Sequence, residues 1–125
     1  MGQSKPFDTK TILIVEDEAI IRFDLVDFFS EAGYRVFEAA SADEAIAVLN
    51  TERSIRVVLT DIQMPGSMDG LKLAHYVRDR YPPTVLLLTS GARFIEDKDL
   101  PAASVFIRKP FNPSRMLSQI DKLMV

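Results

Sequence analysis

Two stretches of this sequence decide the fold: Thr11-Ile-Leu-Ile-Val15, which is followed by Glu16 and Asp17, and Val57-Val-Leu-Thr60, which is followed by Asp61. Each is a short apolar run rich in β-branched residues, which is typical of a strand buried on both faces of a parallel sheet. Each run also ends in acid. Clustered carboxylates repel one another and raise each other's pKa, so such a cluster is costly unless its members share a role. A bound divalent cation would remove that cost.

The composition is that of one compact domain. With 125 residues, 47% of them hydrophobic, the chain can bury one core and leaves no room for a second. The net charge of −3 is unlike the basic surfaces that bind nucleic acid, so direct nucleic-acid binding is not expected. The absence of cysteine excludes disulfides and thiolate metal sites. The polar first residues do not resemble a signal peptide, and no apolar run spans a bilayer, so we expect a cytoplasmic protein without membrane contact.

Strand-type and helix-type segments alternate along the rest of the chain. Ser41 and Glu44 have the spacing of a capping box, and Asn112-Pro113 offers an N-cap followed by proline at the first helical position. The segment 93–103 has a poor helical pattern, so its helix is expected to be brief, irregular or mobile. The pattern predicts further strands at 35–39, 85–89 and 104–108, and helices at 19–32, 41–49, 71–80 and from 113 onward.

Five strands that alternate with helices predict an α/β fold, a doubly wound parallel sheet with helices on both faces and right-handed crossovers. Ligands of such sheets bind beyond the carboxyl ends of the strands. The chemistry-bearing residues at or just past predicted strand ends should therefore share one edge: Glu16, Asp17, Asp61, Thr89, Ser90 and Lys109.

An ordered set of short motifs, each after the appropriate strand, resembles the receiver domains of two-component response regulators, typified by the chemotaxis response regulator. The resemblance covers residues 11–125 and leaves 1–10 as an N-terminal extension. It implies the flavodoxin-like strand order 2-1-3-4-5. The motifs are Val15-Glu-Asp-Glu18, Asp61-Ile-Gln-Met-Pro65, Asp69-Gly70, Thr89-Ser-Gly91 and Lys109-Pro110.

The resemblance implies a role for each acidic position. Asp61 is the implied phosphoacceptor, which forms an acyl phosphate. Glu16 and Asp17, together with Asp61 and the backbone carbonyl of Gln63, are the implied ligands of Mg²⁺, a hard cation that prefers oxygen donors. Lys109 is implied to place its ammonium on a phosphoryl oxygen.

A hydroxyl at the end of the fourth strand is implied to bind another phosphoryl oxygen and to act as a switch. Ser90 and Thr89 both remain candidates, and Ser90 before Gly91 fits the family pattern better. The aromatic switch position falls on Phe106, which lacks a hydroxyl, so any coupling there must act through packing.

The implied partners are a sensor histidine kinase or histidine phosphotransfer protein as phosphodonor and a downstream protein effector; no separate substrate turnover is expected. An alternative function is that of a Mg²⁺-dependent aspartyl phosphatase or phosphotransferase acting on small molecules. Such enzymes usually carry a second acid two residues after the nucleophile, where this chain has Gln63. A flavodoxin-type cofactor carrier is disfavoured, because acids and not a phosphate-binding loop follow the first strand.

Three other features carry expectations. The aromatic residues Phe23, Phe28 and Phe29 are expected to pack in the core. The loop Gly66-Ser-Met-Asp69 is one residue longer than the common family version, and the segment between Gly91 and Val105 is shorter than usual.

Overall fold

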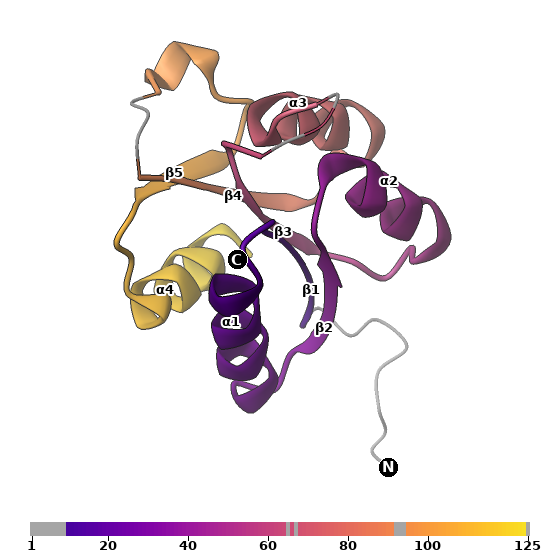
Figure 1. Cartoon of the computed structure of the whole chain (residues 1–125). Helices are drawn as coiled ribbons and strands as arrows, with labels where there is room; N and C mark the ends of the chain where they lie inside the picture. The colour runs from indigo at the N-terminus through magenta and orange to yellow at the C-terminus, as the bar shows by residue number, and fades with distance from the viewer. Residues whose placement is uncertain (1–9, 65, 67, 92–94, 125) are drawn as a thin grey trace.

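The computed structural model describes residues 10–64, 66, 68–91 and 95–124. Within them a five-stranded sheet has the order β2-β1-β3-β4-β5, and every strand pair is parallel (Figure 1). The predicted doubly wound α/β fold and its strand order are therefore confirmed. The strands are β1 (Thr11–Val15), β2 (Arg35–Ala39), β3 (Val57–Asp61), β4 (Val85–Ser90) and β5 (Ser104–Arg108), and the helices are α1 (Ala19–Glu31), α2 (Ala42–Thr51), α3 (Gly70–Arg80), α4 (Pro113–Leu123) and the 3₁₀ turn η1 (Asp97–Asp99).

The sheet lies between two helical layers, with α1 and α4 on one face and α2 and α3 on the other (Figure 1). Side chains alternate between these layers along each strand. On β1, Ile12 and Ile14 pack with α1 and α4, whereas Leu13 and Val15 pack with α2 and α3. All four are 0–1% exposed, as expected for a strand covered on both faces.

Local signals set the helix ends much as the sequence predicts. Ser41 Oγ accepts a hydrogen bond from the Glu44 amide at 3.2 Å, and the Glu44 carboxylate accepts one from the Ala40 amide at 2.9 Å. The capping box is thus present, with the return bond one residue earlier than in the usual form. Asn112 caps α4, since its side-chain oxygen accepts from the Ser114 amide at 2.8 Å.

The connection between β4 and β5 contains only the single turn η1 among its described residues, in line with the expectation for this segment. Residues 92–94, which belong to the same expectation, lie outside the described residues. Helix α3 holds the connection from one side: His75 Nε2 lies 2.8 Å from the Asp99 carbonyl oxygen, and Arg78 Nε donates to the Ala102 carbonyl at 2.7 Å.

The expectation for the aromatic residues of α1 is wrong for Phe23. Phe29 is fully buried and Phe28 is half-buried, but Phe23 is 55% exposed and Ile20, one turn earlier, is 78% exposed. The cause is helical geometry: Phe23 and Phe29 are six residues apart, so they do not share one face of a helix. Among the described helices, none is long and apolar enough to cross a membrane.

Candidate acidic site at the carboxyl edge of the sheet

Three carboxylates meet where β1 and β3 end. These strands are paired neighbours, with Val15 opposite Thr60, so the residues that follow them are adjacent in space. Glu16, Asp17 and Asp61 each place a carboxylate oxygen within 4.8 Å of the other two. Glu16 and Asp61 are buried, whereas Asp17 is accessible to solvent. The predicted convergence of the acids is present in the structure.

Lys109 reaches this cluster from the end of β5, across β4. Its ammonium nitrogen lies 3.2 Å from Glu16 Oε1 and 3.3 Å from Asp61 Oδ1. Gly91, which directly follows β4, lies beside the lysine, and a Cβ at position 91 would be in ordinary contact with Lys109 Cβ at 3.4 Å. One cation thus bridges the two buried acids.

Burial and charge perturb the pKa values of the two buried acids and of the lysine that bridges them. Burial raises the pKa of Glu16, against a hydrogen bond from the Glu18 amide, and nearby Asp61 raises it further. Burial likewise raises the pKa of Asp61, which Lys109 opposes and Asp17 reinforces. Burial lowers the pKa of Lys109, but the carboxylates of Asp61 and Glu16 more than offset this, so its pKa is raised. The site therefore holds more negative charge than its one lysine can compensate, and a further cation would relieve it.

Main-chain donors fix the orientation of the two buried carboxylates. The Glu18 amide donates to Glu16 Oε2 at 3.0 Å, and the Gln63 amide donates to the Asp61 carboxylate. The first residue of α3, Gly70, donates to the Ile62 carbonyl at 2.8 Å and approaches so closely that a Cβ would lie 1.9 Å from the Asp61 carbonyl oxygen. The sequence motif contains Gly70, but only the structure reveals that this glycine seats α3 on the acidic strand end.

A cavity of about 290 Å³ opens beside the acids and is the place where a small ligand could meet them. The atoms that could bind a metal ion there are carboxylate and carbonyl oxygens, with neither sulfur nor imidazole among them. Mg²⁺ prefers such oxygen ligands. The residues therefore fit this ion. The cavity is lined by Asp17, Glu18, Asp61, Gln63, Gly91 and Lys109.

The two candidate switch hydroxyls point to opposite faces of the sheet. Residues of β4 alternate, with Leu86 and Leu88 in the α2/α3 layer and Leu87 in the α1/α4 layer. Ser90 continues the first series and Thr89 the second. Phe106 is half-buried in the α2/α3 layer and pairs with Leu88. Ser90 therefore shares its sheet face with Phe106, and Thr89 does not.

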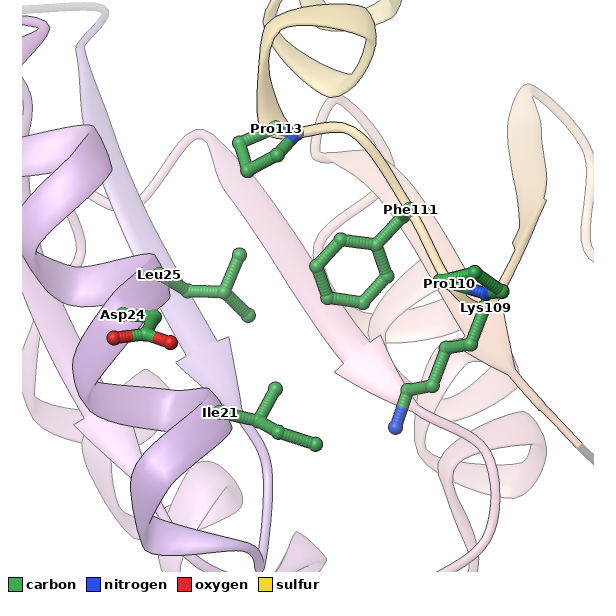
Figure 2. Close-up of a pocket in the computed structure, with 7 residues that line it drawn as sticks. All are labelled: Ile21, Asp24, Leu25, Lys109, Pro110, Phe111 and Pro113. Carbon is green, nitrogen blue, oxygen red and sulfur yellow. The ribbon is translucent and has the colours of Figure 1, made fainter.

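An apolar cavity of about 570 Å³ adjoins the acidic site between α1 and the connection from β5 to α4. Figure 2 shows Ile21 and Leu25 of α1 opposite the ring of Phe111, with the aliphatic stem of Lys109 along the border. Lys109 thus belongs to both cavities, with its stem against the apolar one and its ammonium among the acids.

Comparisons with known proteins identify the family. The model of the response regulator receiver domain matches residues 12–121, so the chain belongs to the receiver domains of two-component signal transduction. This membership agrees with the fold and the acidic site, and it leaves the alternative of a small-molecule phosphatase without support.

Two similar proteins of known sequence are longer than this chain. The aerobic respiration control protein ArcA of Escherichia coli K12 is 37% identical over 119 residues, which cover 93% of this chain and 49% of ArcA. The sensor kinase CckA of Brucella abortus is 32% identical over 120 residues, which are 91% of this chain and 12% of CckA. The chain thus spans about half the length of the first of these relatives and a small part of the second.

Solved structures share the fold. A response regulator receiver protein from Sinorhizobium medicae is 29% identical with a TM-score of 0.85, and the match covers 91% of this chain and 93% of that one. The response regulator protein TrrA from Thermotoga maritima, solved in complex with Mg²⁺ and BeF, is 30% identical with a TM-score of 0.81 over 91% of this chain and 98% of that one.

Proposed function

We propose that this receiver domain accepts a phosphoryl group on Asp61 from a phosphohistidine of a sensor histidine kinase or histidine phosphotransfer protein. One observation carries the proposal: the buried Asp61 carboxylate lies 3.3 Å from the Lys109 ammonium and shares its cavity with Asp17. A nucleophilic carboxylate, a fixed cation and an acidic cation site are the parts that phosphoryl transfer requires.

In the reaction, an oxygen of Asp61 forms a bond to phosphorus and the bond from phosphorus to the donor's imidazole nitrogen breaks, with its electron pair kept by the imidazole. Lys109 binds a phosphoryl oxygen through a charge-assisted hydrogen bond. Glu16, Asp17 and Asp61, with the backbone carbonyl of Gln63, would hold Mg²⁺, and the ion would supply positive charge to the phosphoryl oxygens. The chain turns over no separate substrate, because the product remains on its own aspartate.

Ser90 is the hydroxyl that we assign to the switch, because it lies on the same sheet face as Phe106. When Asp61 carries a phosphoryl group, the Ser90 hydroxyl binds one of its oxygens and Phe106 packs into the space that the serine leaves. Thr89 is the alternative hydroxyl, and its place in the β4 series of Leu87, on the other sheet face from Phe106, argues against it.

Asp61 is only 7% exposed, so a protein donor has to bring its phosphohistidine very close to the domain. It must therefore contact the surface around Asp61. The exposed apolar side chains of Ile20 and Phe23 lie in the first two turns of α1, directly after the acidic turn. These exposed apolar side chains favour contact with an apolar face of the donor.

The wider role follows from the same proposal. We assign residues 11–125 to the receiver and 1–10 to an N-terminal extension. The phosphorylated domain presents a changed surface to a downstream protein effector, acts in the cytoplasm and does not itself bind nucleic acid. The net charge of −3 supports the last point.

Intact mass after incubation with a small phosphodonor tests the proposal. We expect a phosphoryl adduct on the wild-type protein that requires Mg²⁺ and is absent from Asp61→Asn. An adduct on the Asp61→Asn protein at the wild-type level would overturn the assignment. If the wild-type protein gains no adduct from a small donor, failure to bind beryllofluoride in the presence of Mg²⁺ would likewise exclude a working acceptor site.

A further inference from the structure

A contact network outside the acidic cluster fixes the turn that carries two of its acids. Arg22, in the first turns of α1, donates from Nη1 to the Glu16 carbonyl oxygen at 2.7 Å. Its Nε donates to Glu38 Oε1 on β2 at 3.0 Å. Its guanidinium also lies over the Phe23 ring, 5.4 Å from the centroid. The Arg22 side chain is 15% exposed, so it is held by packing as well as by hydrogen bonds.

The charge of this arginine is paired outside its own helix. Arg22 is the fourth residue of α1, close to the helix N-terminus, whose partial positive charge does not stabilise a cation. The charge is compensated by Glu38, from the neighbouring strand, and the planar guanidinium is suited to hold two acceptors at fixed angles. Arg22 therefore links α1, β2 and the acidic turn.

The turn needs such support because of Asp17. Glu16 and Asp61 are tethered by Lys109, and each accepts a hydrogen bond from a main-chain amide. For the carboxylate of Asp17, no hydrogen bond is present among the described residues. Its position therefore depends on the peptide that joins it to Glu16, and the carbonyl of that peptide is the group that Arg22 holds.

We propose that Arg22, anchored by Glu38, is a positioning residue for the cation site: it fixes the peptide between Glu16 and Asp17 and so holds the Asp17 carboxylate beside Asp61. This inference rests on the proposed function, because it assumes that the acids bind Mg²⁺. Partners that orient metal ligands commonly change metal affinity by an order of magnitude or more.

Charge and positioning predict opposite results for Arg22, which makes the test sharp. If Arg22 acted only through its positive charge, Arg22→Met would tighten Mg²⁺ binding and Glu38→Gln would weaken it. If it positions Asp17, both substitutions weaken binding. We expect the Mg²⁺ dissociation constant, measured by NMR titration, to rise about tenfold in Arg22→Met. We expect a smaller rise in Arg22→Lys, which keeps the charge but cannot hold both acceptors.

Matched controls remove the same charges far from the site. Arg53→Met and Glu31→Gln change exposed residues toward the opposite edge of the sheet and should leave the dissociation constant unchanged. The melting temperature of Arg22→Met is measured in parallel, so that the titration is made well below unfolding. Equal or tighter binding of Mg²⁺ by Arg22→Met would overturn the positioning role.

A metal-free measurement separates this inference from the proposed function. Without Mg²⁺, the amides of Asp17 and Glu18 should exchange with solvent faster in Arg22→Met than in the wild type, while amides of β3 keep their rates. Unchanged exchange at both residues would refute the positioning role of Arg22. If exchange rises but Asp17→Asn binds Mg²⁺ as tightly as the wild type, the cation assignment fails instead, and with it the proposed purpose of the positioning.

Discussion

The Cβ atom that Gly70 lacks would lie 1.9 Å from the main-chain oxygen of Asp61. No rotamer change can relieve this contact, because the backbone of residue 70 fixes the Cβ position and the atom that it meets is a main-chain oxygen. Gly70→Ala should therefore push the start of α3 away from β3 and destabilise the fold by about 2 kcal/mol. Urea unfolding measures the loss. The exposed neighbour Lys72→Ala is the control and should stay within about 0.5 kcal/mol of the wild type; an equal loss in both variants would contradict the close approach.

The raised pKa of Asp61 predicts that metal-free stability falls as the pH rises. A folded-state pKa above the unfolded value means that the folded protein binds the proton more tightly. The resulting stability is present below the unfolded pKa, about 4, and is lost as the pH rises through the folded pKa. Glu16 acts in the same direction. The raised pKa of Lys109 contributes stability that is lost only above about pH 10, so it does not alter this range.

Asp61→Asn should consequently be more stable than the wild type at pH 7 in chelator, with a flatter pH profile. Thermal unfolding between about pH 4 and pH 8 is the measurement, and a difference of about 1 kcal/mol would appear as a shift of roughly 4 °C. Asp79→Asn, at an exposed position of α3, should keep the wild-type profile. A profile of Asp61→Asn as steep as that of the wild type would show that burial of this acid is not the cause.

Lys109→Ala should separate phosphoryl transfer to Asp61 from the change in the protein surface that follows it. Loss of the ammonium removes a charge-assisted hydrogen bond, and we expect acceptance from a small phosphodonor to slow by about a hundredfold without being abolished. The amide shifts of β5 on addition of beryllofluoride and Mg²⁺ should shrink at the same time. Full-sized shifts in Lys109→Ala would mean that the surface change does not pass through this lysine. Lys98→Ala, an exposed lysine of η1, is the matched control.

Ser90→Ala and Thr89→Val distinguish the two candidate hydroxyls. Each removes one buried hydroxyl from neighbouring positions of β4. In Ser90→Ala, beryllofluoride should still bind, but the aromatic resonances of Phe106 should no longer shift. The reason is that the variant lacks the hydroxyl whose movement toward the phosphoryl group draws Phe106 inward. In Thr89→Val the shift should persist. The reverse pattern would assign the switch to Thr89.

Ile20→Ser should impair transfer from a protein donor and spare transfer from a small one. The Ile20 side chain is 78% exposed on α1, so its loss should not disturb the core. Truncation of an apolar anchor at an interface commonly costs about 1.4 kcal/mol or more, which corresponds to about tenfold in affinity. The measurement compares the rate of transfer from the cognate kinase, once it is identified, with the rate of transfer from a small phosphodonor. Equal slowing with both donors would locate the effect in the site and not in docking.

Elements with strong local signals were predicted closely from the sequence. The strands Arg35–Ala39 and Ser104–Arg108 have their predicted bounds, and the Ser41 and Asn112 caps are present. These features depend on neighbouring residues alone: alternating or continuous apolar runs for strands, and short polar side chains that accept from free amides for helix starts. The exposure of Phe23 was not predicted, because a helix with apolar residues on all sides does not reveal which side packs against the core.

The sequence by itself determined which residue types follow which strands, and a parallel sheet brings strand ends to one edge. The approach of Glu16, Asp17, Asp61 and Lys109 was therefore predictable from topology. Only the tertiary structure decided the contacts between elements that are distant in the chain: Gly70 against Asp61, Ser90 on the face of Phe106, and Arg22 between Glu16 and Glu38. Such contacts depend on register and on helix rotation, which are set by how the whole core packs and not by any local run of residues.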